Sequence, residues 1–332
     1  MSFKYIMPCQ QQPKKHSLPA YKLDQYKAPE NYIIKPDQAC AINVALYMNQ
    51  PLLITGEPGT GKTQLASRIS WCLDLGAPLI FNTKSTSTAT DLFYTYNSLA
   101  RFHAAQTEKS YRDGTYFITY NALGKAILFS NNLEDIDQIE KEYETKLVLN
   151  NEVRTSQKQK VVLIDEIDKA PRDFPNDLLN ELEHCSFEIP ELNNAKISAN
   201  QEYFPIIIIT SNSEKHLPDA FLRRCVYYHI EFPDLKEMKA IVTQRLKEIS
   251  DPAINDMLFL FYQLRNTKQI QKKPATAELL VCAKSVYEFI NGYTIKDDEK
   301  EFVKHIILST LIKKERDLPV AKEVVEKWLS EK

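Results

Sequence analysis

Hydrophobic positions follow two different patterns along the chain, and the change between them divides it into two regions. Up to about residue 233, short and almost continuous apolar runs alternate with stretches in which apolar residues recur every three to four positions. The first pattern predicts buried strands and the second predicts helices. The predicted strands are 52–55, 78–82, 160–164, 203–210 and 226–230. The helices predicted between them are 37–49, 64–75, 91–106, 121–128, 133–146 and 172–184. This alternation indicates an α/β fold, with a parallel sheet covered by helices on both faces.

The second region, after Pro233, has no strand-like runs. It contains helical patterns at 234–249, 256–265, 276–290, 298–312 and 320–329. We therefore expect two domains, a larger α/β domain at 29–233 and a smaller, all-helical domain at 234–332. Residues 1–28 are polar, carry several prolines and show no periodicity, which predicts a loosely ordered N-terminal arm.

Composition and charge argue against several classes of protein. The chain has 332 residues, of which 43% are hydrophobic and 26% are charged, as in ordinary globular proteins. A net charge of −2 gives no general attraction to nucleic acid or to an anionic membrane. The sequence has no apolar run of the roughly 18 residues that a membrane helix needs, and its N-terminus lacks the apolar core of a signal peptide. The six cysteines are far apart, which argues against a disulfide framework or a zinc site. We expect a cytoplasmic protein.

Three of the seven glycines lie in one eight-residue stretch, GEPGTGKT, at residues 56–63. The stretch follows a predicted strand and precedes a predicted helix, which is the context of a phosphate-binding loop. Glycine lets the backbone curl so that N–H groups point at phosphate oxygens, assisted by the N-terminus of the following helix. Lys62 would then bridge the β- and γ-phosphates, and the Thr63 hydroxyl would bind Mg²⁺.

Two acidic residues end the apolar run VVLI, about 100 residues after this loop. Asp165 and Glu166 would lie at the carboxyl end of a buried strand, where ligands bind in parallel sheets. Asp165 suits a Mg²⁺ ligand that acts through water. Glu166 suits the base that orients or deprotonates the attacking water.

A third polar group follows the strand of four isoleucines. Asn212 ends this strand and would position water against the γ-phosphate. Further on, Arg223 and Arg224 close a short helix, and an arginine there could reach the γ-phosphate of a neighbouring subunit. The pattern favours Arg224 over Arg223 for this role but leaves both open.

The order of these elements resembles that of an AAA+ ATPase. The details resemble the MoxR branch, one of the helix-2-insert branches. GEPGTGKT is the first motif, and TSN is sensor 1. DEIDKAP stands where relatives read DEINRAP, and LPDAFLRRC stands where relatives read LPEAxxxRF. The resemblance covers about residues 30–330. It implies a P-loop core with a five-stranded parallel sheet, an insertion at about 83–160 and a helical lid. It also implies a hairpin that pairs 188–190 with 203–204.

The resemblance further implies ATP and Mg²⁺ as cofactors and a homo-oligomeric ring, a hexamer, that hydrolyses ATP. Such a ring would remodel or mature a partner complex in the manner of a chaperone, with a von Willebrand factor A protein as a candidate partner. The implied nucleotide-binding residues are Gly56, Glu57, Pro58, Gly59, Thr60, Gly61, Lys62, Thr63 and Asp165. The implied metal ligands are Thr63 and Asp165, and the implied catalytic residues are Glu166, Asn212, Arg223 and Arg224.

One departure from the MoxR pattern concerns the lid. Relatives often carry a sensor 2 arginine where this chain reads KKPATAEL. Either Lys272 or Lys273 replaces it, or the lid senses nucleotide differently, and Glu278 could belong to a contact between subunits. Residues 107–116 and 191–201 are open to interpretation as pore loops, partner loops or ordinary surface.

Two other classes of function compete with a remodelling ATPase. A nucleic-acid-directed motor would need a basic pore or patch, which the near-neutral charge does not indicate. Salt-dependent binding to DNA would distinguish it. A nucleotide-held scaffold in a defence or signalling assembly would turn over little ATP, and the intact Glu166 argues against a dead site.

Overall fold

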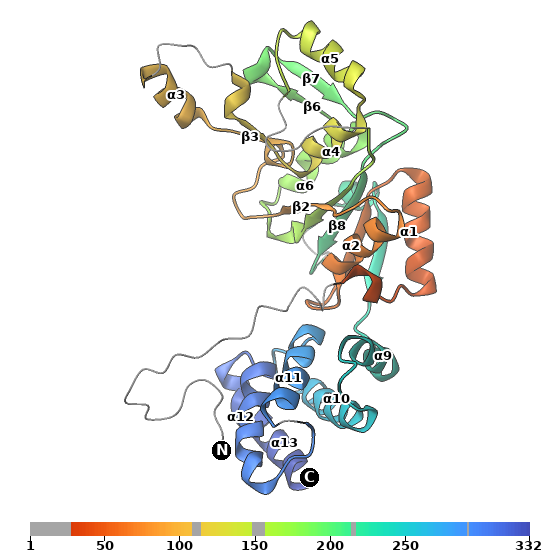
Figure 1. Ribbon diagram of the computed structural model, residues 1–332, viewed down its shortest axis with the longest axis vertical. Helices are drawn as coiled ribbons and strands as arrows, with labels where there is room; N and C mark the ends of the chain where they lie inside the picture. Colours follow the sequence, from red (N-terminus) through yellow and green to blue (C-terminus); the bar gives the residue numbers. More distant parts are fainter. Residues whose placement is uncertain (1–27, 108–113, 148–156, 214–216, 291) are drawn as a thin grey trace. The chain divides into compact units, whose positions relative to one another are not determined.

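The computed structural model describes residues 28–107, 114–147, 157–213, 217–290 and 292–332. They form two compact units (Figure 1). The larger unit comprises Ile34–Glu57 and Gly61–Ile230, and the helices after Glu231 belong to the smaller unit. The predicted N-terminal arm and parts of the predicted insertion lie outside the described residues.

A five-stranded parallel sheet forms the centre of the larger unit, with the strand order β2-β5-β8-β1-β9. Its strands are β1 (Leu52–Gly56), β2 (Leu79–Asn82), β5 (Val161–Asp165), β8 (Ile206–Ser211) and β9 (Val226–Ile230). The predicted α/β class and the five-stranded parallel sheet are confirmed. β8 begins three residues later than predicted, directly after Pro205, which has no N–H to donate to a neighbouring strand.

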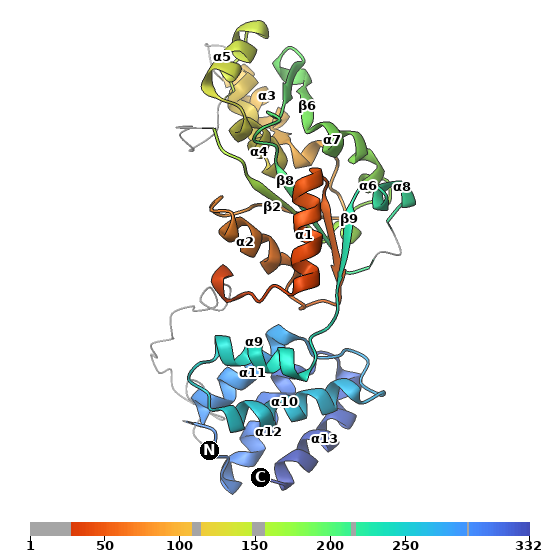
Figure 2. The same cartoon turned by 90° about the vertical axis from the view of Figure 1, so that its right-hand side faces the viewer.

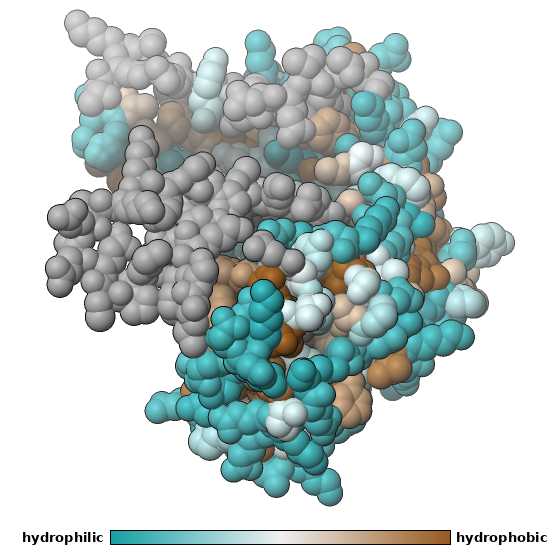
Figure 3. Space-filling model, turned by 60° about the horizontal axis from the view of Figure 1, so that its bottom comes forward, coloured by the Kyte–Doolittle hydropathy of each residue, from teal (hydrophilic) through white to brown (hydrophobic). Residues whose placement is uncertain are grey.

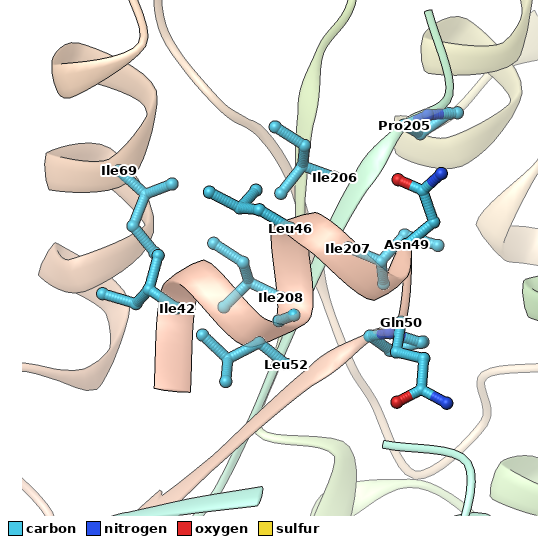
Figure 4. A pocket seen from close by; sticks show the side chains of 12 residues that line it. Ile42, Leu46, Asn49, Gln50, Leu52, Ile69, Pro205, Ile206, Ile207 and Ile208 are labelled. Atoms are coloured by element: carbon cyan, nitrogen blue, oxygen red, sulfur yellow. The ribbon is translucent and has the colours of Figure 1, made fainter. Parts of the chain in front are cut away.

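Two helices, α1 (Pro36–Met48) and α2 (Lys62–Cys72), lie side by side on one face of the sheet (Figures 1 and 2). Successive strand residues point to opposite faces. Leu52 and Ile208 line a small cavity of about 20 Å³ beneath these helices (Figure 4), whereas Leu53 and Ile209 join the hydrophobic core on the other face. The cavity has room for one water-sized sphere and is walled mainly by isoleucine and leucine, so we regard it as a packing gap.

The opposite face is covered by α4 (Ala122–Ser130), which packs on β2 and β5. The predicted insertion also contains β3 (Tyr94–Tyr96), α3 (Ser98–Thr107), β4 (Ile118–Tyr120) and α5 (Leu133–Glu142). The prediction of one helix over 91–106 is wrong in its first half. There the β-forming residues Tyr94–Tyr96 pair antiparallel with β4, and the helix starts only after Asn97, whose side chain accepts a hydrogen bond from the Ala100 N–H.

A second hairpin differs from the one that the resemblance implied. β6 (Ser186–Ile189) pairs with β7 (Ala195–Ser198) and not with 203–204. Asn193 and Asn194 both have positive φ, at 54° and 59°, which suits the tight return of the chain before β7. The helix predicted over 172–184 is divided into α6 (Phe174–Asp177) and α7 (Leu179–His184). α8 (Asp219–Leu222) precedes β9.

The smaller unit is entirely helical in its described residues. Its helices are α9 (Leu235–Arg245), α10 (Asp251–Asn266), α11 (Thr276–Phe289), α12 (Lys300–Leu311) and α13 (Leu318–Ser330). They enclose a separate hydrophobic core. Hydrophilic side chains dominate the face of this unit that Figure 3 brings forward. None of the described helices is both long enough and apolar enough to span a membrane.

The lid residues singled out from the sequence have local partners. The Glu278 carboxylate accepts a hydrogen bond from the Ala275 N–H, 2.5 Å away, and so caps its own helix α11. The Lys273 ammonium donates to the Thr267 carbonyl at 2.6 Å. The Lys272 side chain is exposed, and which of the two lysines replaces the sensor 2 arginine stays a prediction.

Candidate functional site

The glycine-rich stretch forms a loop between β1 and α2, as expected for a phosphate-binding loop. Gly59 and Gly61 have φ angles of 81° and 91°, in the left-handed region that side chains other than glycine seldom adopt. Gly61 directly precedes the first turn of α2, so the loop runs straight into the N-terminus of a helix. This is the backbone arrangement that binds phosphate groups.

The Lys62 side chain lies inside this loop. Its ammonium donates to the carbonyls of Gly56 and Glu57, at 2.7 and 2.9 Å, and to the Asn212 Oδ1 at 2.9 Å. Lys62 is only 6% exposed. Burial lowers the pKa of Lys62, against the opposing influence of Asp168, Asp165, Glu166 and Glu57. The ammonium is therefore short of compensating negative charge, and an anion brought into the loop would supply it.

Thr63 and Asp165 come together although 102 residues separate them in sequence. The Thr63 hydroxyl lies 3.1 and 3.2 Å from the two carboxylate oxygens of Asp165. A hydroxyl and a carboxylate placed side by side are the oxygen donors that Mg²⁺ favours. The donor set therefore fits Mg²⁺ binding.

Glu166 follows Asp165 in an unusual backbone conformation. Its φ of 56° and ψ of 53° place it in the left-handed region, which costs a residue with a side chain about 1 kcal/mol or more. The conformation directs its carboxylate to Lys169 on one oxygen, through an ion pair, and to the Asn212 amide on the other, at 3.4 Å. Strain of this kind is concentrated at functional sites.

Three residues that the sequence analysis gave no individual role, Thr210, Ser211 and Asp168, hold the ends of β5 and β8 together. Thr210 accepts a hydrogen bond from the Glu166 N–H at 2.9 Å and donates to the Asp165 Oδ1 at 2.5 Å. The Asp168 carboxylate, in the segment after β5, accepts hydrogen bonds from two groups at the end of β8. These are the Asn212 N–H at 3.0 Å and the Ser211 hydroxyl at 3.1 Å. Thr210 and Ser211 are fully buried. Both belong to the TSN motif at the polar end of the isoleucine strand, in which the sequence analysis gave a role to Asn212 alone.

The two arginines lie apart from this cluster. The Arg224 guanidinium pairs with the Glu183 carboxylate of the same chain at 3.5 Å, and both side chains are about half exposed. Arg223 is also exposed. An exposed pair of this kind contributes about 0–1 kcal/mol, so it would not prevent Arg224 from reaching another group.

The structure therefore brings together Lys62, Thr63, Asp165, Glu166 and Asn212, at the shared carboxyl edge of β1, β5 and β8. It does not bring Arg223 or Arg224 into contact with them within the described residues. In the described part of the chain, no group of three or more His, Cys, Asp or Glu side chains has the geometry of a metal site. The described cysteines are all free thiols.

Comparison with known proteins gives a family and a set of distant structural similarities. No curated protein sequence matches the chain. Among solved structures, the chain is similar to two mutants of RuvB from Thermotoga maritima. One aligns with 17% identity and a TM-score of 0.46, over 87% of this chain and 71% of its own. The other aligns with 16% identity and a TM-score of 0.41, over 87% and 70%. Similarity at this level says nothing about function.

The family model described as AAA domain (dynein-related subfamily) matches residues 51–225. This match covers more than half of the chain and includes every predicted site residue from Gly56 to Arg224. AAA domains in general bind nucleotide and hydrolyse ATP. The chain belongs to the family of AAA domains, in its dynein-related subfamily.

Proposed function

We propose that this protein is a Mg²⁺-dependent ATPase of the MoxR type that works as a ring and remodels a partner protein complex. The observation that carries the proposal is the convergence of Lys62, Thr63, Asp165, Glu166 and Asn212 at one edge of the sheet. An ammonium inside a glycine-rich loop, a pair of oxygen donors, a carboxylate base and an amide are the parts that phosphoryl transfer to water requires.

The loop and Lys62 would bind the phosphates of ATP. The backbone N–H groups between Gly56 and Thr63 would donate to phosphate oxygens, and the Lys62 ammonium would exchange its contacts with the Gly56 and Glu57 carbonyls for phosphate oxygens. The burial that lowers the pKa of Lys62 supports this assignment, because a bound anion relieves the cost of burying its charge.

Thr63 and Asp165 would hold Mg²⁺, which would supply charge neutralisation on the β- and γ-phosphates when bound. Thr63 would bind through its hydroxyl. Asp165 would act through water, and the hydrogen bond from Thr210 fixes the orientation of its carboxylate.

Glu166 and Asn212 would handle the attacking water. The Asn212 amide donates to Glu166 and its carbonyl oxygen accepts from Lys62, so Asn212 links the base to the phosphate-binding lysine. The Glu166 carboxylate would orient the water and take its proton, after release from the exposed ion pair with Lys169.

A ring would complete the site. Arg224 and Arg223 are exposed and make no contact with the other site residues of their own chain among the described residues. An arginine so placed would act in trans, on the γ-phosphate bound to a neighbouring copy, which requires a closed assembly such as a hexamer. The remodelling role, the von Willebrand factor A partner and the cytoplasmic location come from the MoxR resemblance.

Separate measurements of nucleotide binding and turnover test the catalytic assignment. Glu166→Gln should bind a fluorescent ATP analogue within about threefold of wild type but lose at least about 100-fold in turnover, because it removes the base and keeps the phosphate loop. Lys62→Ala should lose binding itself. If Glu166→Gln hydrolyses ATP at the wild-type rate, Glu166 is not the base.

A further inference from the structure

The Glu166 carboxylate has a different partner on each of its two oxygens. One oxygen accepts a hydrogen bond from the Lys169 ammonium, within an ion pair. The other accepts from the Asn212 amide at 3.4 Å. An N–H···O hydrogen bond is usually about 2.7–3.2 Å long, so the contact with Asn212 is weak and has room to shorten. The carboxylate is therefore held more firmly by Lys169 than by Asn212.

The turn that carries Lys169 is fixed to the rest of the domain. This 3-10 turn, η5 (Ile167–Lys169), directly follows Glu166. Ile167 is buried in the hydrophobic core, and the Asp168 carboxylate bonds to the end of β8. The Lys169 N–H donates to the Glu166 carbonyl at 2.9 Å and closes the turn. The ammonium is therefore always offered beside the Glu166 carboxylate.

The Glu166 side chain can change partner while its backbone stays in place. Its N–H bonds to the buried Thr210 hydroxyl at 2.9 Å, which holds the left-handed backbone conformation. The side chains of Glu166 and Lys169 are 39% and 54% exposed. An ion pair this exposed is weak, so it can open without disturbing β5 or the turn. A rotation of one side chain then exchanges Lys169 for Asn212.

Asn212 connects this carboxylate to the phosphate-binding loop. Its Oδ1 accepts from the Lys62 ammonium at 2.9 Å, and its Nδ2 donates to Glu166. A phosphate that takes over the Lys62 ammonium would leave Asn212 without that donor, and the amide would be free to turn and shorten its contact with Glu166. A ligand shifts an equilibrium only when it binds one arrangement better than the other. Here Lys62 supplies that difference, because it serves Asn212 in one arrangement and the phosphate in the other.

We propose that Lys169 restrains Glu166 until a phosphate binds to Lys62. An adjacent ammonium favours the charged form of a carboxylate, which makes the carboxylate a weaker acceptor for the proton of water. After the exchange of partners, Asn212 would hold one oxygen of Glu166 and the other would be free for the attacking water. This inference rests on the proposed role of Glu166 as the base, but the ion pair itself is tested without ATP turnover.

Acetylation of lysines in the full chain by an N-hydroxysuccinimide ester, followed residue by residue with mass spectrometry, tests the ion pair. Only the neutral amine reacts, and the hydrogen bond to Glu166 raises the pKa of Lys169. Lys169 should therefore react at least about threefold faster in Glu166→Gln than in the wild type. Lys300, which pairs with Asp297 in the helical unit, should react equally in both. Equal rates at Lys169 would overturn the proposal.

The same labelling with Mg²⁺ and a saturating non-hydrolysable ATP analogue tests the release. Lys169 of the wild type should react at least about twofold faster with the analogue than without it, because the ion pair has opened. In Asn212→Ala, whose link to Lys62 is removed, the analogue should leave the rate unchanged. An unchanged wild-type rate, or an increase that persists in Asn212→Ala, would overturn the proposal and leave the ATPase function standing. Failure of the analogue to bind would overturn the proposed function, and this inference with it.

Turnover tests the restraint. Lys169→Met removes the charge, and kcat/KM for ATP should rise about two- to fivefold because the free chain no longer has to break a weak ion pair. Lys169→Arg keeps the ion pair and should stay within about twofold of the wild type. Lys300→Met is the matched control, since it removes another lysine that pairs with a carboxylate three residues away, and it should have no effect. An unchanged or lower kcat/KM in Lys169→Met would show that Lys169 does not restrain the base.

Discussion

Thr210 connects the catalytic candidate Glu166 with the candidate metal ligand Asp165 through one hydroxyl. It accepts from the Glu166 N–H and donates to the Asp165 carboxylate, and it is completely buried. Glu166 has a left-handed backbone conformation, so its N–H bond to Thr210 also holds a strained residue in place. Single-residue changes at this position therefore report on how the site is held.

Thr210→Val should lower the free energy of unfolding by about 1–3 kcal/mol, because it removes the partner of the half-buried Glu166 N–H and one of the two hydroxyls that donate to the Asp165 Oδ1. ATP turnover should fall at least about tenfold. Thr210→Ser keeps the hydroxyl and should retain most of both properties. Urea unfolding and a turnover assay measure the two effects. Equal behaviour of the valine and serine variants would contradict the bridging role.

Lys62 gives a prediction about pH. Burial lowers the folded-state pKa of Lys62 below its ordinary value of 10.5. Between the folded and the unfolded pKa the unfolded chain binds more protons at this position, so the stability of the wild type rises with pH in that window. The wild type should therefore gain stability relative to Lys62→Met as the pH is raised from 7 towards 10.5, in urea unfolding without nucleotide. A constant difference, or one of opposite sign, would contradict the burial argument.

Among the elements, the central sheet was the most predictable. Runs such as VVLI and IIII suit strands that are buried on both faces, and their alternation with helical patterns along the chain already implied a parallel sheet. The β3–β4 hairpin was missed, and the hairpin expected at 188–190 was given the wrong partner strand, because short edge pairs depend on a partner that local sequence does not identify. Tyr94–Tyr96 consists of β-forming residues, but its partner strand, Ile118–Tyr120, cannot be identified from the local sequence. The domain bounds at 29, 233 and 234 stay predictions.

The same distinction applies to the site. Lys62, Thr63, Asp165, Glu166 and Asn212 were found from sequence because their roles fix their spacing from strand ends. The contacts of Thr210 and Asp168 were not found because they join two strands about 45 residues apart in the chain. A carboxylate three residues after Asp165 has no recognisable role until β8 is placed beside it.

The contact between α4 and the chain before β3 gives a prediction at this scale. A side chain at Gly124 would place its Cβ 2.1 Å from the Phe93 carbonyl oxygen, and backbone cannot move aside as a flexible side chain can. Gly124→Ala should therefore destabilise the protein by about 1–3 kcal/mol, despite the better helix propensity of alanine, which is worth about 1 kcal/mol.

Gly114→Ala is the matched control. Its Cβ would lie 3.2 Å from the nearest atom, a much milder contact. Thermal unfolding compares the two variants. If both shift the midpoint equally, the close packing of α4 is not the cause.

For the whole molecule, the central claim is that active sites are shared between copies. Each chain has the phosphate loop, the base and the amide in contact, while its exposed arginines lie outside that cluster. The chain alone would then be a poor ATPase, and its turnover would depend on assembly.

The most direct measurement is ATP turnover against protein concentration, for the wild type, Glu166→Gln, Arg224→Ala and an equal mixture of the two variants. We expect specific activity to rise with concentration, and each variant alone to lose at least about 100-fold. The mixture should recover part of the activity, because some interfaces then combine an intact Glu166 with an intact Arg224. Specific activity independent of concentration, together with wild-type turnover by Arg224→Ala, would contradict a shared site.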